Sequence, residues 1–98
     1  MADTFQVVYS SRIKTKLKIL HRESVKTGRG DLFLQLLKRV DERLRTEPHL
    51  FGESLYTLPS GKGQIRHGIE EFLGAYWAVR EEERVVFLKD YRLLGAQS

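Results

Sequence analysis

The spacing of apolar side chains in this chain changes once, close to Pro48. Before Pro48 the apolar residues recur at intervals of three and four, which is the repeat of an amphipathic helix. After it, short apolar and aromatic runs separated by turn-forming residues predict β-strands. A chain whose helices are grouped before most of its strands is typical of an α+β domain, a two-layer arrangement with helices packed on one face of an antiparallel sheet.

The part before Pro48 predicts one strand followed by two helices. The strand is expected over residues 5–9, and the helices over residues 11–26 and 31–46. Ser10 or Ser11 can serve as the N-cap of the first helix, and Asp31 as the cap of the second. Gly28 and Gly30 interrupt the helical pattern, because glycine accepts the backbone angles that a chain reversal needs. The two helices therefore form an αα-hairpin with one shared apolar side.

The part after Pro48 predicts four strands that continue into a meander. They are expected over residues 54–58, 64–69, 72–79 and 84–91, the last two joined by the polar hairpin 80–83. The resulting core is expected to contain Phe33, Leu36, Leu37, Val40, Val86 and Leu88, with Leu17 and Leu20 beside them. No repeat or linker divides the chain, so residues 1–98 are expected to form a single domain.

Composition excludes several classes of function. The chain has no cysteine, and so no disulfide framework, thiol nucleophile or cysteine zinc site. His21, His49 and His67 lack metal-ligand spacing, and neither a metal nor a cofactor is expected. No apolar run approaches the roughly 18–20 residues that cross a bilayer, and the first residues do not resemble a secretion signal. We therefore expect a cytoplasmic protein without a membrane partner.

Positive charge is concentrated in the first expected helix. Residues 12–29 hold seven basic side chains and one acidic one, within a chain whose net charge is +4. Lys14, Lys18 and Arg22, which we call the basic ridge, repeat every four residues and so share one face of a helix. Such a face attracts nucleic acid or an acidic protein, although many solvated helix faces also carry charge of this kind.

Short sequence motifs along almost the whole chain resemble those of the RelE/ParE superfamily of type II toxin–antitoxin toxins. They are Tyr9-Ser10, Gly28-Arg29-Gly30, Val40-Asp41-Glu42-Arg43-Leu44, Phe51-Gly52-Glu53, Tyr76-Trp77-Ala78-Val79 and Arg84-Val85-Val86-Phe87-Leu88. The resemblance implies the family fold and a cognate antitoxin as partner. RelE-type members cut mRNA on the ribosome, whereas ParE-type members act on DNA gyrase, and fold alone does not distinguish these activities.

The resemblance also implies that catalytic residues lie on the third and last expected strands. RNA cleavage by 2′-hydroxyl attack needs a base, an acid and cations at the phosphate. The catalytic candidates are Arg66, His67, Tyr91 and Arg92, and Lys89 joins the basic ridge as a candidate for nucleic-acid binding. Strand alternation predicts that Arg66 points outward and that His67 shares the core side with its isoleucine neighbours.

The same alternation predicts that Lys89 and Tyr91 share one face of the last strand, with Asp90 and Arg92 paired on the other. Family members commonly carry an arginine where this chain has Gly74, so Arg66 is the expected substitute at the phosphate. Three functions remain open: a RelE-like endoribonuclease, a ParE-like or catalytically inactive binding protein, and a plain nucleic-acid-binding module.

Overall fold

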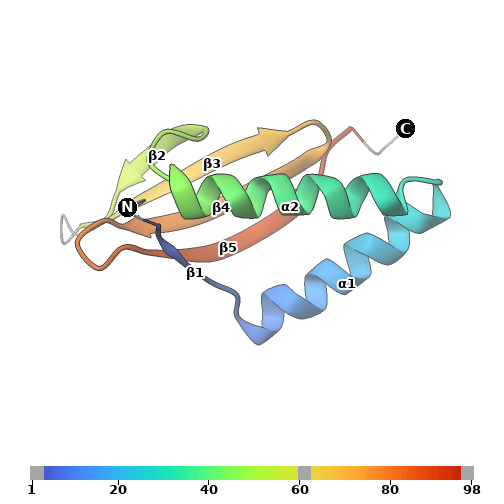
Figure 1. The fold of residues 1–98 in the computed structure, drawn as a ribbon, viewed down its shortest axis with the longest axis horizontal. Coiled ribbons are helices and arrows are strands. Elements are labelled where there is room, and N and C mark those ends of the chain that lie inside the picture. Colours follow the sequence, from blue (N-terminus) through green and yellow to red (C-terminus); the bar gives the residue numbers. More distant parts are fainter. Residues whose placement is uncertain (1–3, 60–62, 96–98) are drawn as a thin grey trace.

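The structure is a computed structural model that describes residues 4–59 and 63–95. The elements in chain order (Figure 1) are β1 (Gln6–Val8), α1 (Ser11–Lys26), α2 (Gly30–Thr46), β2 (Glu53–Thr57), β3 (Gln64–Glu70), β4 (Leu73–Arg80) and β5 (Val85–Leu93). The predicted α+β class is confirmed, and each expected element is present within two residues of its expected bounds. Within the described residues, neither helix is long and apolar enough to cross a membrane.

The five strands form one mixed sheet in the order β1-β5-β4-β3-β2. β2 to β5 pair antiparallel, as the sequence predicts. The direction in which β1 joins this meander was not predicted, and it pairs parallel to the start of β5, from Gln6 opposite Val85 to Val8 opposite Phe87. Parallel neighbours need a crossover connection rather than a hairpin, and the intervening helices and strands supply it.

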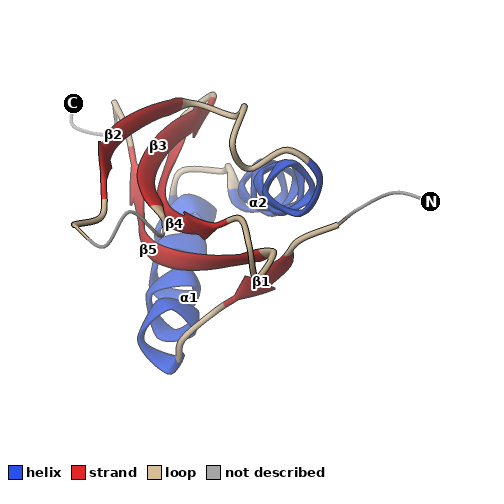
Figure 2. Cartoon of the chain, turned by 90° about the vertical axis from the view of Figure 1, so that its left-hand side faces the viewer, coloured by secondary structure: helices blue, strands red, loops and turns tan. Residues whose placement is uncertain are grey.

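α2 lies across one face of the sheet, where it contacts β1, β3 and β4 (Figure 2). α1 contacts α2 and β5, and so lies beside the sheet rather than sharing the position of α2. β1 pairs with only the first three residues of β5. Beyond them, the Arg12 guanidinium on α1 donates to the Lys89 carbonyl oxygen at 2.9 Å. We call the face under α2 the covered face, and the opposite face, which carries no helix within the described residues, the open face.

The apolar core lies between the helices and the covered face. Its largest fully buried side chains include Trp77, Tyr91, Phe33, Ile13, Leu36 and Leu44. Most of the expected core residues are buried: Phe33, Leu36, Val40, Leu20, Val86 and Leu88. Leu17 and Leu37 are only partly buried and pack against the margin of this core.

Local sequence explains where the helices begin. The Ser10 hydroxyl accepts a hydrogen bond from the Ile13 amide at 3.2 Å, which confirms a serine N-cap for α1. Gly28 reverses the chain with φ of 77°, a conformation that favours glycine. α2 begins at Gly30, so Asp31 lies inside its first turn and the expectation that it caps the helix is wrong.

The loop after α2 is held against the sheet by Trp77 and Phe51. The Trp77 indole Nε1 donates to the Pro48 carbonyl oxygen at 3.3 Å, and its ring stacks on Phe51 with centroids 5.2 Å apart. Gly68 on β3 leaves room for these rings, since a Cβ atom there would lie 2.8 Å from Phe51 Cζ. This packing holds the loop against the covered face of β3.

Candidate functional site

The open face carries three stacked side chains, His67, Tyr76 and Arg92, which we call the His67 cluster. His67 and Tyr76 are opposite each other on β3 and β4, and their ring centroids lie 4.4 Å apart with an interplanar angle of 24°. The Arg92 guanidinium on β5 lies 5.3 Å from the centroid of the Tyr76 ring. An imidazole, a phenol ring and a guanidinium therefore lie side by side on a helix-free surface.

The faces predicted for Arg66 and His67 are exchanged in the structure. His67 is half-buried on the open face together with Ile69, which is 50% exposed, whereas Arg66 lies on the covered face and is 7% exposed. The predicted orientation is wrong because the isoleucines of β3 do not mark its core side. Gly68 and the ring of Phe51 define that side instead, and this packing depends on the loop after α2, which is distant in sequence.

Arg66 is bound by the loop rather than presented outward. Its Nε and Nη2 groups donate to the Phe51 carbonyl oxygen at 3.3 and 3.2 Å, and Nη2 also donates to the Gly52 carbonyl oxygen at 3.1 Å. Its Nη1 group donates to the Gln64 side-chain oxygen at 3.1 Å. Arg66 therefore does not present a cation on the open face beside Gly74.

Asp90 connects the His67 cluster to α1. Its carboxylate accepts from Lys16 Nζ at 2.5 Å and from Arg92 Nε at 3.0 Å, so the predicted pairing with Arg92 is confirmed. Partial burial alone would raise the pKa of the Asp90 carboxyl, but the hydrogen bonds from Lys16 and Arg92 outweigh it and hold that pKa below its ordinary value. The Nη groups of Arg92 make no hydrogen bond within the described residues, and they remain available to an anion.

Tyr91 is separated from Lys89 by an irregularity in the ladder. The pairing of β4 with β5 shifts register between Tyr76 and Trp77. Asp90 is opposite Tyr76 and Leu88 is opposite Trp77, so Lys89, which lies between Asp90 and Leu88, has no register partner on β4. Lys89 is exposed, whereas Tyr91 is fully buried among core residues, and the expectation that they share a face is wrong. Burial, and then the neighbouring Tyr9 hydroxyl, raise the pKa of the Tyr91 phenol far above its ordinary value.

Tyr91 lies in the core close to Tyr9 and Asp41, and it is not part of a surface site. The Tyr9 hydroxyl donates to Asp41 Oδ1 at 2.7 Å, and Arg45 Nε donates to Asp41 Oδ2 at 2.7 Å. Burial and the contact with Asp41 likewise raise the pKa of Tyr9. Neither phenol is placed to exchange a proton with a ligand on the open face.

The basic ridge is presented to solvent along α1. Lys14, Lys18 and Arg22 are all exposed, and none of them forms an ion pair in the part of the chain that the structure describes. Lys16, two positions from Lys14 and from Lys18 in the same helix, pairs with Asp90. The basic ridge therefore lies on a helix that is connected to the His67 cluster through Lys16, Asp90 and Arg92.

Gly74 lies on the open face beside the His67 cluster. It is opposite Arg92 on β5, and a Cβ atom there would lie 3.2 Å from Leu94 Cδ1 and 3.7 Å from His67 Nε2. The Leu94 side chain therefore fills the space beside Gly74. Arg92, on the neighbouring strand, places its guanidinium over the ring of Tyr76.

An apolar row crosses the open face next to the His67 cluster. Successive register partners on the five strands are Tyr56, Ile65, Ala78, Phe87 and Val8. Tyr56 is 58% exposed and Phe87 37% exposed. Neither this row nor the contacts of Tyr76 and Lys16 could be predicted from sequence, because strand register brings these residues together.

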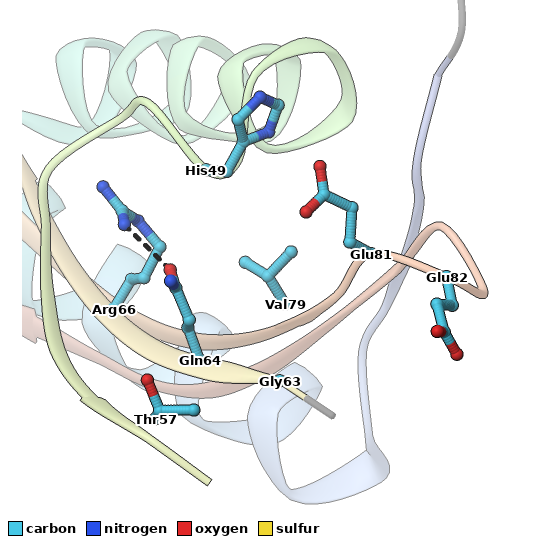
Figure 3. Close-up of a pocket in the computed structure, with 8 residues that line it drawn as sticks. All are labelled: His49, Thr57, Gly63, Gln64, Arg66, Val79, Glu81 and Glu82. Carbon is cyan, nitrogen blue, oxygen red and sulfur yellow. Dashed lines mark hydrogen bonds between the residues drawn. The ribbon is translucent and has the colours of Figure 1, made fainter. Parts of the chain in front are cut away.

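A separate cavity of about 500 Å³ lies on the covered side, between the loop after α2 and the ends of β2, β3 and β4 (Figure 3). It is lined by His49, Thr57, Gly63, Gln64, Arg66, Val79, Glu81 and Glu82. Arg66 is the one predicted catalytic residue that it contains. Arg66 and this cavity therefore lie on one face of the sheet, whereas His67 and Arg92 lie on the other face.

Among residues 4–59 and 63–95, no three histidine, aspartate or glutamate side chains are grouped as metal ligands. No protein-family model, curated protein or solved structure matches the chain. A function for this chain is therefore inferred from the arrangement of its side chains.

Proposed function

We propose that this chain is the toxin of a type II toxin–antitoxin system with a RelE/ParE-like fold, and that it cleaves mRNA on the ribosome. The supporting observation is the His67 cluster, which combines a proton-transfer group with a guanidinium on an open surface. The order of elements supports the family assignment, since one strand and a helical hairpin precede an antiparallel meander.

Each member of the cluster has a distinct chemical task in this proposal. His67 exchanges a proton with the attacking 2′-hydroxyl or the leaving oxygen, because histidine is the side chain that ordinarily changes charge near neutral pH. Arg92 contacts the phosphate through its Nη groups, and Asp90 holds it in position through Nε. Tyr76 lies between the two groups, and its ring packs against both of them and holds them in position.

Lys89 and the basic ridge supply the charge that binds RNA. Their side chains are exposed and lie on β5 and on the helix that contacts it. Lysine contacts to phosphate give affinity without reading sequence, so we expect recognition to depend on the ribosomal context of the mRNA. The proposal places the protein in the cytoplasm, where a cognate antitoxin would neutralise it.

The apolar row and Gly74 support a second candidate, a ParE-like or catalytically inactive protein that binds DNA gyrase or another protein. Exposed aromatic side chains such as Tyr56 and Phe87 belong to a class that is enriched at protein interfaces. A glycine in place of the family arginine removes one charge donor, a loss that typically lowers the rate about 10²–10³-fold. Arg92 must supply that charge if the first candidate is correct.

The deciding experiment measures cleavage of mRNA by the purified protein on programmed ribosomes, read by primer extension. His67→Gln and Arg92→Gln should each lower the cleavage rate about 10²-fold or more. His21→Gln and Arg39→Gln are matched controls, because both residues lie away from the open face, with His21 against Phe33 and Arg39 paired with Glu71. The controls should retain the cleavage rate of the unmutated protein.

Each alternative outcome has a defined meaning. Binding to ribosomes without cleavage by the unmutated protein would reject the endoribonuclease and favour a nucleic-acid-binding module. Failure to bind ribosomes or RNA, together with inhibition of gyrase supercoiling, would instead favour the ParE-like candidate. Cleavage that survives His67→Gln and Arg92→Gln would show that the active site lies elsewhere.

A further inference from the structure

The cavity on the covered side has the features of a second binding site, distinct from the His67 cluster. It lies on the opposite side of β3, is bordered by three strands, the β4–β5 hairpin and the loop after α2, and is partly open to solvent (Figure 3). Its volume of about 500 Å³ falls within the range of cavities that hold small ligands. Polar side chains from four of these segments converge on it, so it is not a defect of core packing.

One wall of the cavity carries a buried positive charge without a negative partner. Arg66 is 7% exposed and forms no ion pair within the described residues. Its acceptors are two backbone carbonyls and the Gln64 amide, all of them neutral. A guanidinium has five N–H groups, and these four hydrogen bonds leave one hydrogen of Nη1 without an acceptor in the described part of the chain. A buried charge of this kind is stabilised by an anion that reaches it.

The opposite wall carries negative charge. The Glu81 carboxylate points toward the space beside His49 and Val79, across the cavity from Arg66 (Figure 3). Glu83 in the same hairpin is neutralised by Arg80 at 2.7 Å, whereas Glu81 has no ion-pair partner within the described residues. Among the residues that the structure describes, the cavity therefore has the buried cation of Arg66 at one end and the exposed carboxylate of Glu81 at the other, and neither forms an ion pair there.

We propose that this cavity binds a small amphoteric molecule, with a carboxylate at Arg66 and a cationic group at Glu81. A free amino acid with a cationic side chain has this chemistry and fits the volume. A carboxylate accepts the free Nη1 hydrogen of Arg66 in a charge-assisted bond, and a guanidinium or ammonium group pairs with Glu81. Thr57 and Gln64 lie along the wall between these ends and offer further hydrogen bonds.

The test is a titration of the ¹⁵N-labelled chain with L-arginine, followed by NMR. We expect saturable shifts of the Gln64 side-chain amide and of backbone amides in residues 63–66 and 79–82. Agmatine, which lacks the carboxylate, and citrulline, which lacks the side-chain charge, should each bind at least roughly tenfold more weakly, because each loses one charge-assisted bond. Changing the ligand leaves the protein intact, so these comparisons do not depend on the folding of a variant.

Two variants test the protein side of the pair. Glu81→Gln should weaken L-arginine binding about tenfold, whereas the matched control Glu83→Gln should leave it unchanged, because Glu83 pairs with Arg80 outside the cavity. Absence of saturable shifts, or equal binding of arginine and agmatine, would overturn the proposal. Inorganic phosphate binding at the same residues as tightly as arginine would also overturn it, since a simple anion site needs no cationic group.

Discussion

Gly68→Ala tests whether the close contact between β3 and the loop after α2 is as tight as the structure indicates. The added methyl group would lie 2.8 Å from Phe51 Cζ and 2.9 Å from Trp77 Cη2, whereas carbon atoms in favourable contact are about 3.5–4.0 Å apart. Relieving that overlap requires the stacked rings to move, and overpacking of this kind typically costs about 1–3 kcal/mol. Replacing glycine would recover about 0.4–1 kcal/mol from the unfolded chain, so we expect a net loss of about 1–2 kcal/mol.

Urea unfolding followed by the fluorescence of Trp77, the single tryptophan of the chain, measures this loss. The midpoint should fall while the slope stays constant, because the surface exposed on unfolding is unchanged. Gly74→Ala is the matched control, since its nearest neighbour is the end of the flexible Leu94 side chain at 3.2 Å, and its stability should change by less than about 0.5 kcal/mol. A Gly68→Ala variant as stable as the parent would refute the packing described for Phe51 and Trp77.

Three further results are expected. Leu36→Ala should cost about 2–5 kcal/mol because Leu36 is fully buried, whereas Leu34→Ala on the exposed side of α2 should cost less than about 0.5 kcal/mol; equal losses in urea melts would contradict the orientation of α2. Asp90→Asn should lower stability at pH 7 by about 1 kcal/mol or less. Because the Asp90 pKa is lowered by folding, its contribution is present above the ordinary value of 3.8, and the difference between variant and parent should disappear in melts as the pH falls through the lowered pKa. Alanine substitution of the whole basic ridge should reduce the slope of log affinity against log salt by roughly 2 for single-stranded RNA, measured by fluorescence anisotropy; an unchanged slope would exclude the ridge from the RNA contact.

Much of the fold could be predicted from sequence because its signals are local. The helical spacing before Pro48, the serine cap and the glycine reversal each act within a few residues, and they placed both helices correctly. The parallel pairing of β1 with β5 and the position of α1 beside the sheet could not be predicted in this way. Both depend on contacts between segments about 75 residues apart, such as Arg12 with Lys89, for which the sequence carries no periodic signal.

The site was harder to predict because strand alternation indicates that neighbours face opposite sides without indicating which side is which. For β3 the side was decided by Phe51 and Gly68, so Arg66 became buried and His67 became accessible. For β5 the register shift next to Tyr76 separated Lys89 from Tyr91. The pairing of Asp90 with Arg92 was predictable because these residues are two apart on one regular stretch of strand.

The position of α1 beside β5 also determines how copies of this protein could join through their sheets. An unpaired strand edge is a template for another strand, and aggregation by that route requires two such edges on each molecule. At one end of this sheet β1 is only three residues long, and α1 occupies the edge of β5 beyond it. The five-residue strand β2, exposed along its whole length, is the edge left at the other end. Two molecules paired through β2 would have no comparable edge left, so growth by strand addition would stop at a dimer instead of producing a fibril.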